Sequence, residues 1–401
     1  MFILRKGIFA YKADIVQIFT VSQSLCFIEG QVQFWQKNGF VVHVICADGE
    51  ELRNLQYNYN VNIYPLPLER KRWSLKKDII SLCLIIKHLY MIKPNLVHVN
   101  TPKASFLGLI ASWLVGIPNR IYEMHGLPVE TAEGIFKMTW LLAEKLMCQT
   151  ATHVIAVSSS LRLSAITKKL VSSSKIEIIN NGSCNGIDTT VKFNLNKIDE
   201  REIRKLRKQY QLSANHPVVG FVGRLTPEKG IKEMYEAWQI VKQKHPTAIL
   251  IVVGGEDLRK NLPLNLKHKL NMDTTIIQTG PVDKPQNYYA LIDFLILPSY
   301  REGLGNVVLE AAAMQKPSIV SEVTGLKDTI VDGQTGLFCN VKDSKMLAQK
   351  INFYIENKNI AILHGQEARR RVCQMFDQQT TWNGKLQFYK RLMPASNRLS
   401  L

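Results

Sequence analysis

The sequence reads Ser299-Tyr300-Arg301-Glu302-Gly303-Leu304-Gly305-Asn306-Val307-Val308-Leu309-Glu310-Ala311 directly after an apolar run of strand length, Phe294 to Leu297. It continues into an alanine-rich segment, Val307 to Met314, that has the composition of a helix. A strand, a tight turn and a helix are therefore predicted here. The two glycines of the turn let the backbone approach a ligand closely, and the free amides of the helix's first turn face that ligand. Two carboxylates, Glu302 and Glu310, flank the turn, although either one alone could be a simple helix cap.

A second stretch, Gly220-Phe221-Val222-Gly223-Arg224-Leu225-Thr226-Pro227-Glu228-Lys229-Gly230, also passes from a strand through a turn to a helix. Thr226 is a typical helix cap and Pro227 suits the first helical position, so Lys229 falls in the first turn and Arg224 just before it. Cations at this end of a helix oppose its dipole and cost stability unless an anion lies between them. The alternative is that both cations are merely solvated. One turn with cations and one with carboxylates suits a diphosphate joined to a hydroxylated sugar.

These motifs, Gly-Arg-x4-Lys-Gly followed by Glu-x7-Glu, resemble the retaining nucleotide-sugar glycosyltransferases of family 4, which have the GT-B fold. The resemblance extends over nearly the whole chain and is most specific in its second half. It implies an α/β protein with two Rossmann-like domains facing a cleft. We expect an acceptor-binding domain over residues 1–188, a nucleotide-sugar domain over residues 189–376, and a C-terminal helix over residues 377–401 that returns to the first domain.

Length and periodicity agree with this organisation. A chain of 401 residues exceeds one ordinary core, so two domains of about 200 residues each are expected. Apolar strands alternate with amphipathic helices in both halves, which predicts parallel sheets covered on both faces, with ligands at the carboxyl ends of the strands. The turn-rich segment Asn180 to Asp188 separates the halves, and the charged segment Lys197 to Lys208 follows it. Later helices are expected at Lys229–Lys244, Leu258–Leu270 and Thr381–Leu392.

The resemblance implies roles for individual residues. Arg224 and Lys229 would clamp the diphosphate and offset negative charge on the leaving nucleotide. Glu310 would accept hydrogen bonds from the ribose, and Glu302 would lie near the hydroxyls of the donor sugar. His125 would lie over that sugar, the alternative being a histidine satisfied by neighbouring backbone. The other donor-binding candidates are Gly223, Val282, Gly303, Leu304, Gly305 and Asn306.

Two features concern the phosphate site. Ser22 to Gly30 lies where family members often have a glycine-rich loop beneath the diphosphate, but here only Gly30 is a glycine. No Asp-x-Asp occurs, and such paired carboxylates commonly hold the divalent ion in metal-dependent transferases. We therefore expect a mechanism without a metal and without a cofactor. The sequence also has no P-loop and no glycine-rich dinucleotide fingerprint, which argues against nucleotide hydrolysis and hydride transfer.

Charge bears on partners and location. The formal net charge is +18, with both halves basic, so an acidic partner is expected. The densest basic cluster is Arg70-Lys71-Arg72-Trp73-Ser74-Leu75-Lys76-Lys77, which suits an anionic leaflet or is simply a solvated loop. Seven dispersed cysteines, no signal-peptide pattern and no apolar stretch of spanning length predict a cytoplasmic protein, peripheral on the inner face of the cytoplasmic membrane.

These observations predict a retaining transferase that moves a hexosyl or N-acetylhexosaminyl group from a nucleoside-diphosphate sugar, UDP-linked, to a hydroxyl of a saccharide acceptor. The resemblance implies a polyprenyl-diphosphate-linked acceptor and a role in building capsule, O-antigen or exopolysaccharide. A GT-B sugar-nucleotide epimerase would use the same phosphate clamp without an acceptor. A nucleic-acid-binding protein would explain the positive charge, but that charge is not gathered beside aromatic readout motifs, so we expect no nucleic-acid partner.

Overall fold

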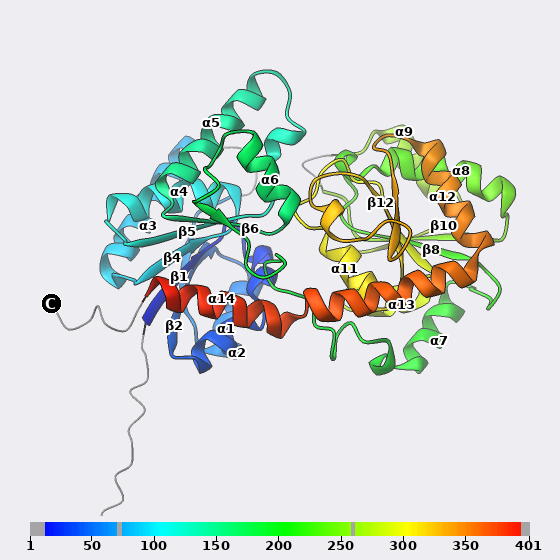
Figure 1. The fold of residues 1–401 in the computed structure, drawn as a ribbon, viewed down its shortest axis with the longest axis horizontal. Coiled ribbons are helices and arrows are strands. Elements are labelled where there is room, and N and C mark those ends of the chain that lie inside the picture. The colour runs from blue at the N-terminus through cyan, green and yellow to red at the C-terminus, as the bar shows by residue number, and fades with distance from the viewer. Residues whose placement is uncertain (1–12, 70–73, 258–260, 394–401) are drawn as a thin grey trace, which may run out of the picture.

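The computed structural model describes residues 13–69, 74–257 and 261–393. Two α/β bodies lie side by side in Figure 1, each built on its own parallel sheet. This confirms the predicted pair of Rossmann-like domains. Residues 70–73, which include Trp73 of the basic cluster, lie outside the described part of the chain.

The first sheet has the strand order β3-β2-β1-β4-β5-β6-β7, and its paired strands are parallel. Helices α1, α2 and α14 lie against one face, and α3, α4 and α5 against the other (Figure 1). Its strands are β1 (Ala13–Ile18), β2 (Phe40–Ala47), β3 (Asn62–Leu66), β4 (Leu96–Val99), β5 (Asn119–Met124), β6 (His153–Ala156) and β7 (Ile176–Glu177). Its helices are α1 (Gln31–Lys37), α2 (Glu50–Tyr59), α3 (Leu75–Ile92), α4 (Pro102–Leu114), α5 (Gly134–Thr150) and α6 (Ser159–Thr167), with the 3-10 turns η1 (Ser22–Ile28) and η2 (Pro128–Glu130).

The second sheet has the order β10-β9-β8-β11-β12-β13. Its direction of growth reverses between β8 and β11, and ligands of such sheets gather outside the carboxyl ends of strands at this switch point. Both glycine-containing turns of the sequence follow these two strands. The strands are β8 (Val218–Val222), β9 (Ile249–Val253), β10 (Ile276–Gly280), β11 (Phe294–Leu297), β12 (Ser318–Ser321) and β13 (Gly336–Cys339). The helices are α7 (Glu200–Gln209), α8 (Ile231–Lys244), α9 (Leu264–Met272), α10 (Pro285–Leu291), α11 (Asn306–Ala313), α12 (Ser344–Glu356) and α13 (Lys358–Met375), with η3 (Leu195–Lys197), η4 (Pro227–Lys229) and η5 (Leu326–Asp328).

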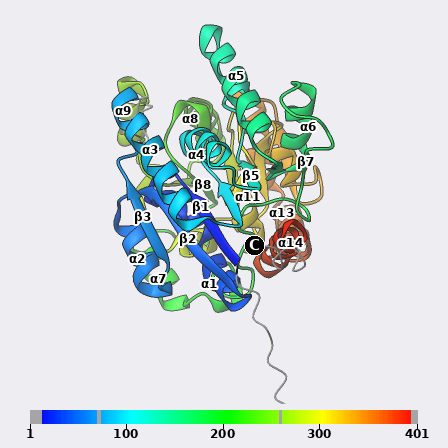
Figure 2. The ribbon, with the colours of Figure 1, turned by 90° about the vertical axis from the view of Figure 1, so that its left-hand side faces the viewer.

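Helix α14 (Gln378–Leu392) returns from the second domain to the first, as predicted (Figures 1 and 2). Its buried residues Leu386, Phe388 and Tyr389 belong to the same hydrophobic cluster as Trp35 and other residues of the first domain. The chain passes between the domains twice, near Ile187 and near Phe376. A hydrogen bond joins these two segments, because the Ile187 amide donates to the Phe376 carbonyl at 2.8 Å. We therefore keep residues 1–188, 189–376 and 377–401 as the proposed division of the chain.

Several local predictions need correction. The helix expected from Lys229 begins at Ile231, because Gly230 has a left-handed backbone (φ 69°) and separates η4 from α8. A Cβ at Gly230 would overlap the carbonyl of Pro298, so only glycine lets this turn approach the end of β11. The hydroxyl of Thr226 makes no capping hydrogen bond. The helix expected at Leu258–Leu270 is α9, which begins at Leu264; residues 258–260 lie outside the described chain.

Candidate active site

A cleft of about 1140 Å³ lies between the domains and is lined by both. Its first wall comes from the carboxyl ends of β1, β4 and β5, and its second from the turns after β8, β9 and β11. His125 and Arg224 are both predicted site residues. His125 lines the first wall and Arg224 lines the second. The wall residues used below are Phe27, His125, Trp140, Arg224, Glu228, Asp257 and Arg301.

The two predicted motif turns meet through an ion pair between Lys229 and Glu302. Both side chains are largely buried, with 16% and 13% of their surface exposed. A cation beside the helix start is thus compensated by a carboxylate from the neighbouring turn, which removes the dipole penalty expected from sequence. The cation site and the carboxylate site are therefore one connected site.

Arg224 is paired differently. Its guanidinium lies 2.5 Å from the carboxylate of Asp257, a buried residue of the segment after β9. The sequence analysis missed Asp257, although its place beyond the carboxyl end of a strand was a usable signal. It also missed Arg301, whose guanidinium lies 3.6 Å from the carboxylate of Glu228 on the same wall. This wall therefore carries cations that are each held by a carboxylate.

Glu310 lies on α11 and accepts a hydrogen bond from the Tyr289 hydroxyl at 2.7 Å. Burial raises the pKa of this carboxyl to about 7, against the opposing effect of the Tyr289 hydrogen bond. The amide end of α11 is built by Gly305, which has a left-handed backbone (φ 64°), and by Asn306, the first helical residue. Leu304 is buried and anchors the turn.

Two predicted donor contacts are less distinctive in the structure. Gly223 directly follows β8 and has a φ of 154°, which favours glycine. Val282 follows β10 and packs part of its side chain against the hydrophobic core. Its contact with a base stays a prediction.

Gly303 lies at the contact between the domains. Its carbonyl accepts a hydrogen bond from the Ser158 hydroxyl at 2.7 Å, and a Cβ at this position would overlap the carbonyl oxygen of His125. The sequence suggested that this glycine lets the backbone approach a ligand. In the structure it lets the backbone approach the first domain, which brings His125 beside the turn that carries Glu302.

A second interdomain contact fixes α6 to the other domain. The carboxylate of Asp328 accepts hydrogen bonds from the Ser160 amide, at 3.1 Å, and from the Ser160 hydroxyl. The oxygen of that hydroxyl in turn accepts a hydrogen bond from the Gly325 amide at 2.7 Å. An anion at the first turn of α6 is favoured by the helix dipole. The domains are therefore held in a defined closed arrangement in this structure.

His125 follows β5 and lines the cleft. Its ring stacks on that of Phe27 with centroids 4.8 Å apart and planes 14° apart. Burial lowers the pKa of the imidazole to about 4, although the nearby Glu123 carboxylate opposes this shift. Among the described residues, Nε2 of His125 has no hydrogen-bond partner. His125 is therefore a neutral imidazole that lines the cleft, while its Nε2 is buried and faces the Glu123 carboxylate at 3.9 Å.

Phe27 was not singled out from the sequence. It lies on η1, the segment Ser22–Ile28, in place of the glycine-rich loop that the family pattern led us to look for. The segment therefore lines the cleft near His125 with an aromatic side chain, whereas its phosphate contact stays untested.

Comparison with known proteins agrees with this geometry. The family model "Glycosyltransferase Family 4" matches residues 28–189, and "Glycosyl transferases group 1" matches residues 202–371. The chain is 33% identical over 384 residues to the capsular polysaccharide biosynthesis glycosyltransferase CapM of Staphylococcus aureus, covering 95% of this chain and 98% of that protein. The chain belongs to the family 4 glycosyltransferases.

Other relatives of this glycosyltransferase are more distant. An Escherichia coli UDP-Gal:α-D-GlcNAc-diphosphoundecaprenol α-1,3-galactosyltransferase is 26% identical over 343 residues, covering 84% of this chain and 86% of that enzyme. The crystal structure of Anabaena HepE in complex with UDP-glucose has a TM-score of 0.78 at 21% identity, covering 94% of this chain and all of that one. A Rickettsia africae glycosyltransferase structure has the same TM-score at 20% identity, covering 96% and 100%. These structural neighbours confirm the GT-B fold.

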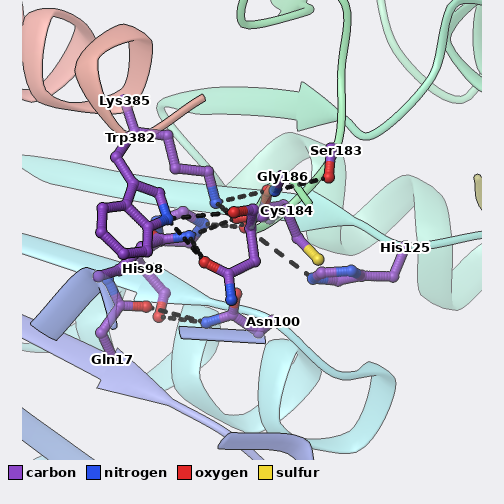
Figure 3. Close-up of polar contacts among 12 residues, drawn as sticks. Gln17, His98, Asn100, His125, Ser183, Cys184, Gly186, Trp382 and Lys385 are labelled. Atoms are coloured by element: carbon purple, nitrogen blue, oxygen red, sulfur yellow. Dashed lines mark hydrogen bonds and ion pairs between the residues drawn. The ribbon is translucent and has the colours of Figure 1, made fainter. Parts of the chain in front are cut away.

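Behind His125 the glycosyltransferase has a buried polar network (Figure 3). The carboxylate of Glu123, on β5, lies 2.8 Å from the ammonium of Lys385 and 3.1 Å from Nε2 of His98. The other ring nitrogen of His98 lies 2.5 Å from the Tyr389 hydroxyl, to which the side-chain amide of Gln17 donates at 3.1 Å. Burial alone would raise the pKa of Glu123, but the Lys385 ammonium and His98 hold it well below its usual range.

The described part of the glycosyltransferase contains no group of three or more His, Cys, Asp or Glu side chains placed to hold a metal ion. In the same part of the chain, no helix has both the length and the apolar character needed to cross a bilayer. The need for a metal and the association with a membrane are therefore questions for experiment.

Proposed function

We propose that this protein is a retaining glycosyltransferase that moves a hexosyl or N-acetylhexosaminyl group from a UDP-sugar to a hydroxyl of a polyprenyl-diphosphate-linked saccharide during synthesis of a surface polysaccharide. The observation that carries this proposal is the Lys229–Glu302 pair, which joins the two motif turns, together with the Arg224–Asp257 pair on the wall of the interdomain cleft. The names of the relatives support the polysaccharide context and a lipid-linked acceptor, and the UDP-glucose complex of a neighbour supports the donor class.

In this proposal the donor diphosphate replaces the carboxylates as partner of the two cations. Lys229 offers a compact charge and Arg224 a planar fork, and both stabilise the negative charge that grows on the diphosphate as the sugar–oxygen bond breaks. Once the diphosphate has replaced Glu302 as the partner of Lys229, the Glu302 carboxylate accepts a hydrogen bond from a hydroxyl of the donor sugar. The departing phosphate oxygen takes the proton of the acceptor hydroxyl on the same face of the sugar, so no side-chain nucleophile is required.

The neutral imidazole of His125 supplies a hydrogen bond to the donor sugar from the opposite wall of the cleft. Near the start of α11, the Glu310 carboxylate accepts hydrogen bonds from the ribose hydroxyls. Backbone amides of the preceding turn bind the phosphate and the sugar; this turn consists of Gly303, Leu304, Gly305 and Asn306. The relatives are named as transferases and synthases, so the epimerase alternative is not favoured.

The test compares kcat/KM for wild type, Lys229→Ala and Arg224→Ala with one donor and one acceptor. Removing a cation from a partly desolvated pair costs about 2–5 kcal/mol. That corresponds to roughly a 30- to 5,000-fold loss in kcat/KM. Lys232→Ala is the matched control, because Lys232 lies three residues after Lys229, in the first turn of α8, with 70% of its side chain exposed. The proposal is contradicted if both variants keep kcat/KM within about threefold of wild type. Such a change is well below the tenfold change in rate that corresponds to about 1.36 kcal/mol.

We further propose that the enzyme binds the anionic inner face of the cytoplasmic membrane through α5. Ile135, Phe136 and Leu142 expose 76%, 71% and 62% of their surfaces on this helix, and the exposed cations Lys137 and Lys145 lie among them. Apolar side chains with interleaved cations suit the interface of an anionic leaflet. The same helix contributes Trp140 to the cleft, so a lipid-linked acceptor would reach the site from this side.

A further inference from the structure

One cation of α14 is buried as completely as any core residue. The side chain of Lys385 is 1% exposed, and so is that of its partner Glu123. The ammonium lies 2.8 and 2.9 Å from the two carboxylate oxygens and donates to the carbonyl of Cys184 at 2.7 Å. Its charge is therefore fully paired, by groups from β5 and from the segment that joins the domains.

A buried ion pair is a weak device for stability, because desolvation of two charges offsets most of their attraction. The surroundings could bury an apolar pair, since the neighbouring α14 residues Leu386, Phe388 and Tyr389 pack into a hydrophobic cluster. Lys385 and Glu123 together thus call for a role other than holding α14 in place.

The position of the carboxylate indicates that role. Glu123 lies two residues before His125, and its Oε2 is 3.9 Å from Nε2 of His125 and 3.1 Å from Nε2 of His98. One carboxylate therefore faces two imidazoles and one ammonium. Three oriented groups around the carboxylate fix the position of its negative charge, which lies 3.9 Å from Nε2 of the cleft histidine.

We propose that Lys385 is a positioning residue for catalysis: by holding the Glu123 carboxylate ionised and fixed behind His125, it sets the orientation of the imidazole that faces the donor sugar. This inference rests on the proposed function for the role of His125, but the Lys385–Glu123–His125 arrangement does not depend on it. The helix that carries Lys385 follows the donor-binding domain in sequence, so the second domain's C-terminal extension completes the first domain's wall of the site.

Several charged or titratable groups face His125, and a measurement of its titration must distinguish their effects. Glu123 and His98 approach from the first sheet, and Lys385 from α14. Phe27 covers the ring from η1. Without Lys385, the cluster of one carboxylate and two imidazoles is left with an uncompensated negative charge. Such a buried site takes up a proton at a much higher pH than an exposed carboxyl does.

The experiment uses Lys385→Met, which keeps the length of the side chain and removes its charge, and the double variant Lys385→Met/Glu123→Gln, which removes both charges. Arg391→Met is the matched control, because Arg391 is a cation of the same helix paired at 2.7 Å with Glu177 of the first domain, but at the exposed surface. For each protein we measure Tm, kcat and KM with a UDP-sugar donor, and the NMR titration of the His98 and His125 rings.

We expect Lys385→Met to lower Tm and to lower kcat about 10- to 100-fold with donor KM within threefold, since a misplacement of about 1 Å can cost on the order of 100-fold. Its histidine rings should show a titration step between about pH 5 and 8 that wild type lacks. The double variant should lose that step and recover Tm without recovering kcat. Arg391→Met should match wild type in kcat and in the ring titration.

Recovery of kcat together with Tm in the double variant would overturn the proposal, because the pair would then serve stability alone. So would an unchanged kcat in Lys385→Met, or ring titrations identical to those of wild type. His125→Ala separates this from failure of the proposed function: if that variant keeps full kcat while Lys385→Met still shows the new titration step, the role of the histidine is wrong and the electrostatic arrangement stands. If Lys385→Met does not fold, the double variant Lys385→Met/Glu123→Gln, which leaves no unpaired buried charge, still decides the question: kcat well below wild type supports the proposal, and wild-type kcat overturns it.

Discussion

At the scale of single residues, the two cations of the proposed phosphate site are held in ion pairs. Lys229 is held by Glu302 and Arg224 by Asp257. A diphosphate must therefore compete with two carboxylates, and the carboxylates it displaces must find new partners. In the proposed mechanism the donor sugar supplies hydroxyl groups to Glu302, so recognition of the phosphate and of the sugar would be one event. A nucleotide without its sugar would leave that carboxylate uncompensated and should bind more weakly than the full donor.

Glu310 predicts a pH dependence of donor binding. Burial raises its pKa to about 7, so the carboxyl is mostly protonated at pH 6 and mostly ionised at pH 8 in the free enzyme. The ionised form is the better acceptor for ribose hydroxyls. The Kd for UDP-glucose should therefore weaken about tenfold from pH 8 to pH 6, as the ionised fraction falls by about that factor.

Titration calorimetry measures this directly, and a nucleotide sugar is the right probe because it has no terminal phosphate that titrates in the same range. In Glu310→Gln the affinity should be weaker at pH 8 and nearly independent of pH. Equal pH slopes in the two proteins would refute the assignment of Glu310.

Metal dependence is also decided by single residues. In the proposed site, Lys229 and Arg224 neutralise the diphosphate, a task that a divalent ion on paired carboxylates performs in other transferases. Turnover should therefore persist after exhaustive chelation and should not rise when magnesium or manganese is added back. Loss of turnover on chelation, with recovery on addition of either ion, would show that the site works through a metal.

At the scale of elements, α6 begins against a carboxylate from the other domain. Asp328 at this helix start contributes about 0.3–2 kcal/mol to the closed arrangement. Asp328→Asn should therefore lower kcat/KM roughly 2- to 30-fold and increase the radius of gyration measured by small-angle X-ray scattering.

Asp199→Asn is its control, because Asp199 caps α7 within one domain and is exposed. That variant should change neither quantity. If Asp328→Asn keeps the wild-type radius and kcat/KM, the contact does not govern closure.

Elements also show why sequence was informative in some places only. Strand β11 was predicted to the residue, because a strand buried on both faces is a continuous apolar run. Helices α2 and α7 were not predicted: α7 fully buries none of its residues, and in its highly charged sequence only Ile203 and Leu206 pack against the core. Lys385 looked like an ordinary helical cation, because its environment is created by a residue 262 positions away.

At the scale of the whole molecule, the basic charge and the exposed apolar side chains of α5 predict salt-dependent membrane binding. The protein should sediment with anionic vesicles at low salt and be released at high salt, since the Debye length falls to about 3 Å at 1 M. Replacing Ile135 and Phe136 by serine should weaken binding at low salt.

Leu264→Ser with Met272→Ser is the matched control, because these exposed apolar residues lie on α9 of the second domain. Binding that ignores salt, or that falls equally in both double variants, would contradict docking through α5.

The return of α14 to the first sheet also has a consequence for biogenesis. Gln17 and Tyr389, which share a hydrogen bond, are separated by 372 positions, so a ribosome adding roughly 5–20 residues per second makes the second about 20–75 s after the first. Throughout that interval the nascent first domain exposes the apolar surface that α14 later covers, including Trp35 and Phe40. Its folding is therefore coupled to the completion of the second domain, and a chaperone that shields this surface during translation would prevent premature aggregation.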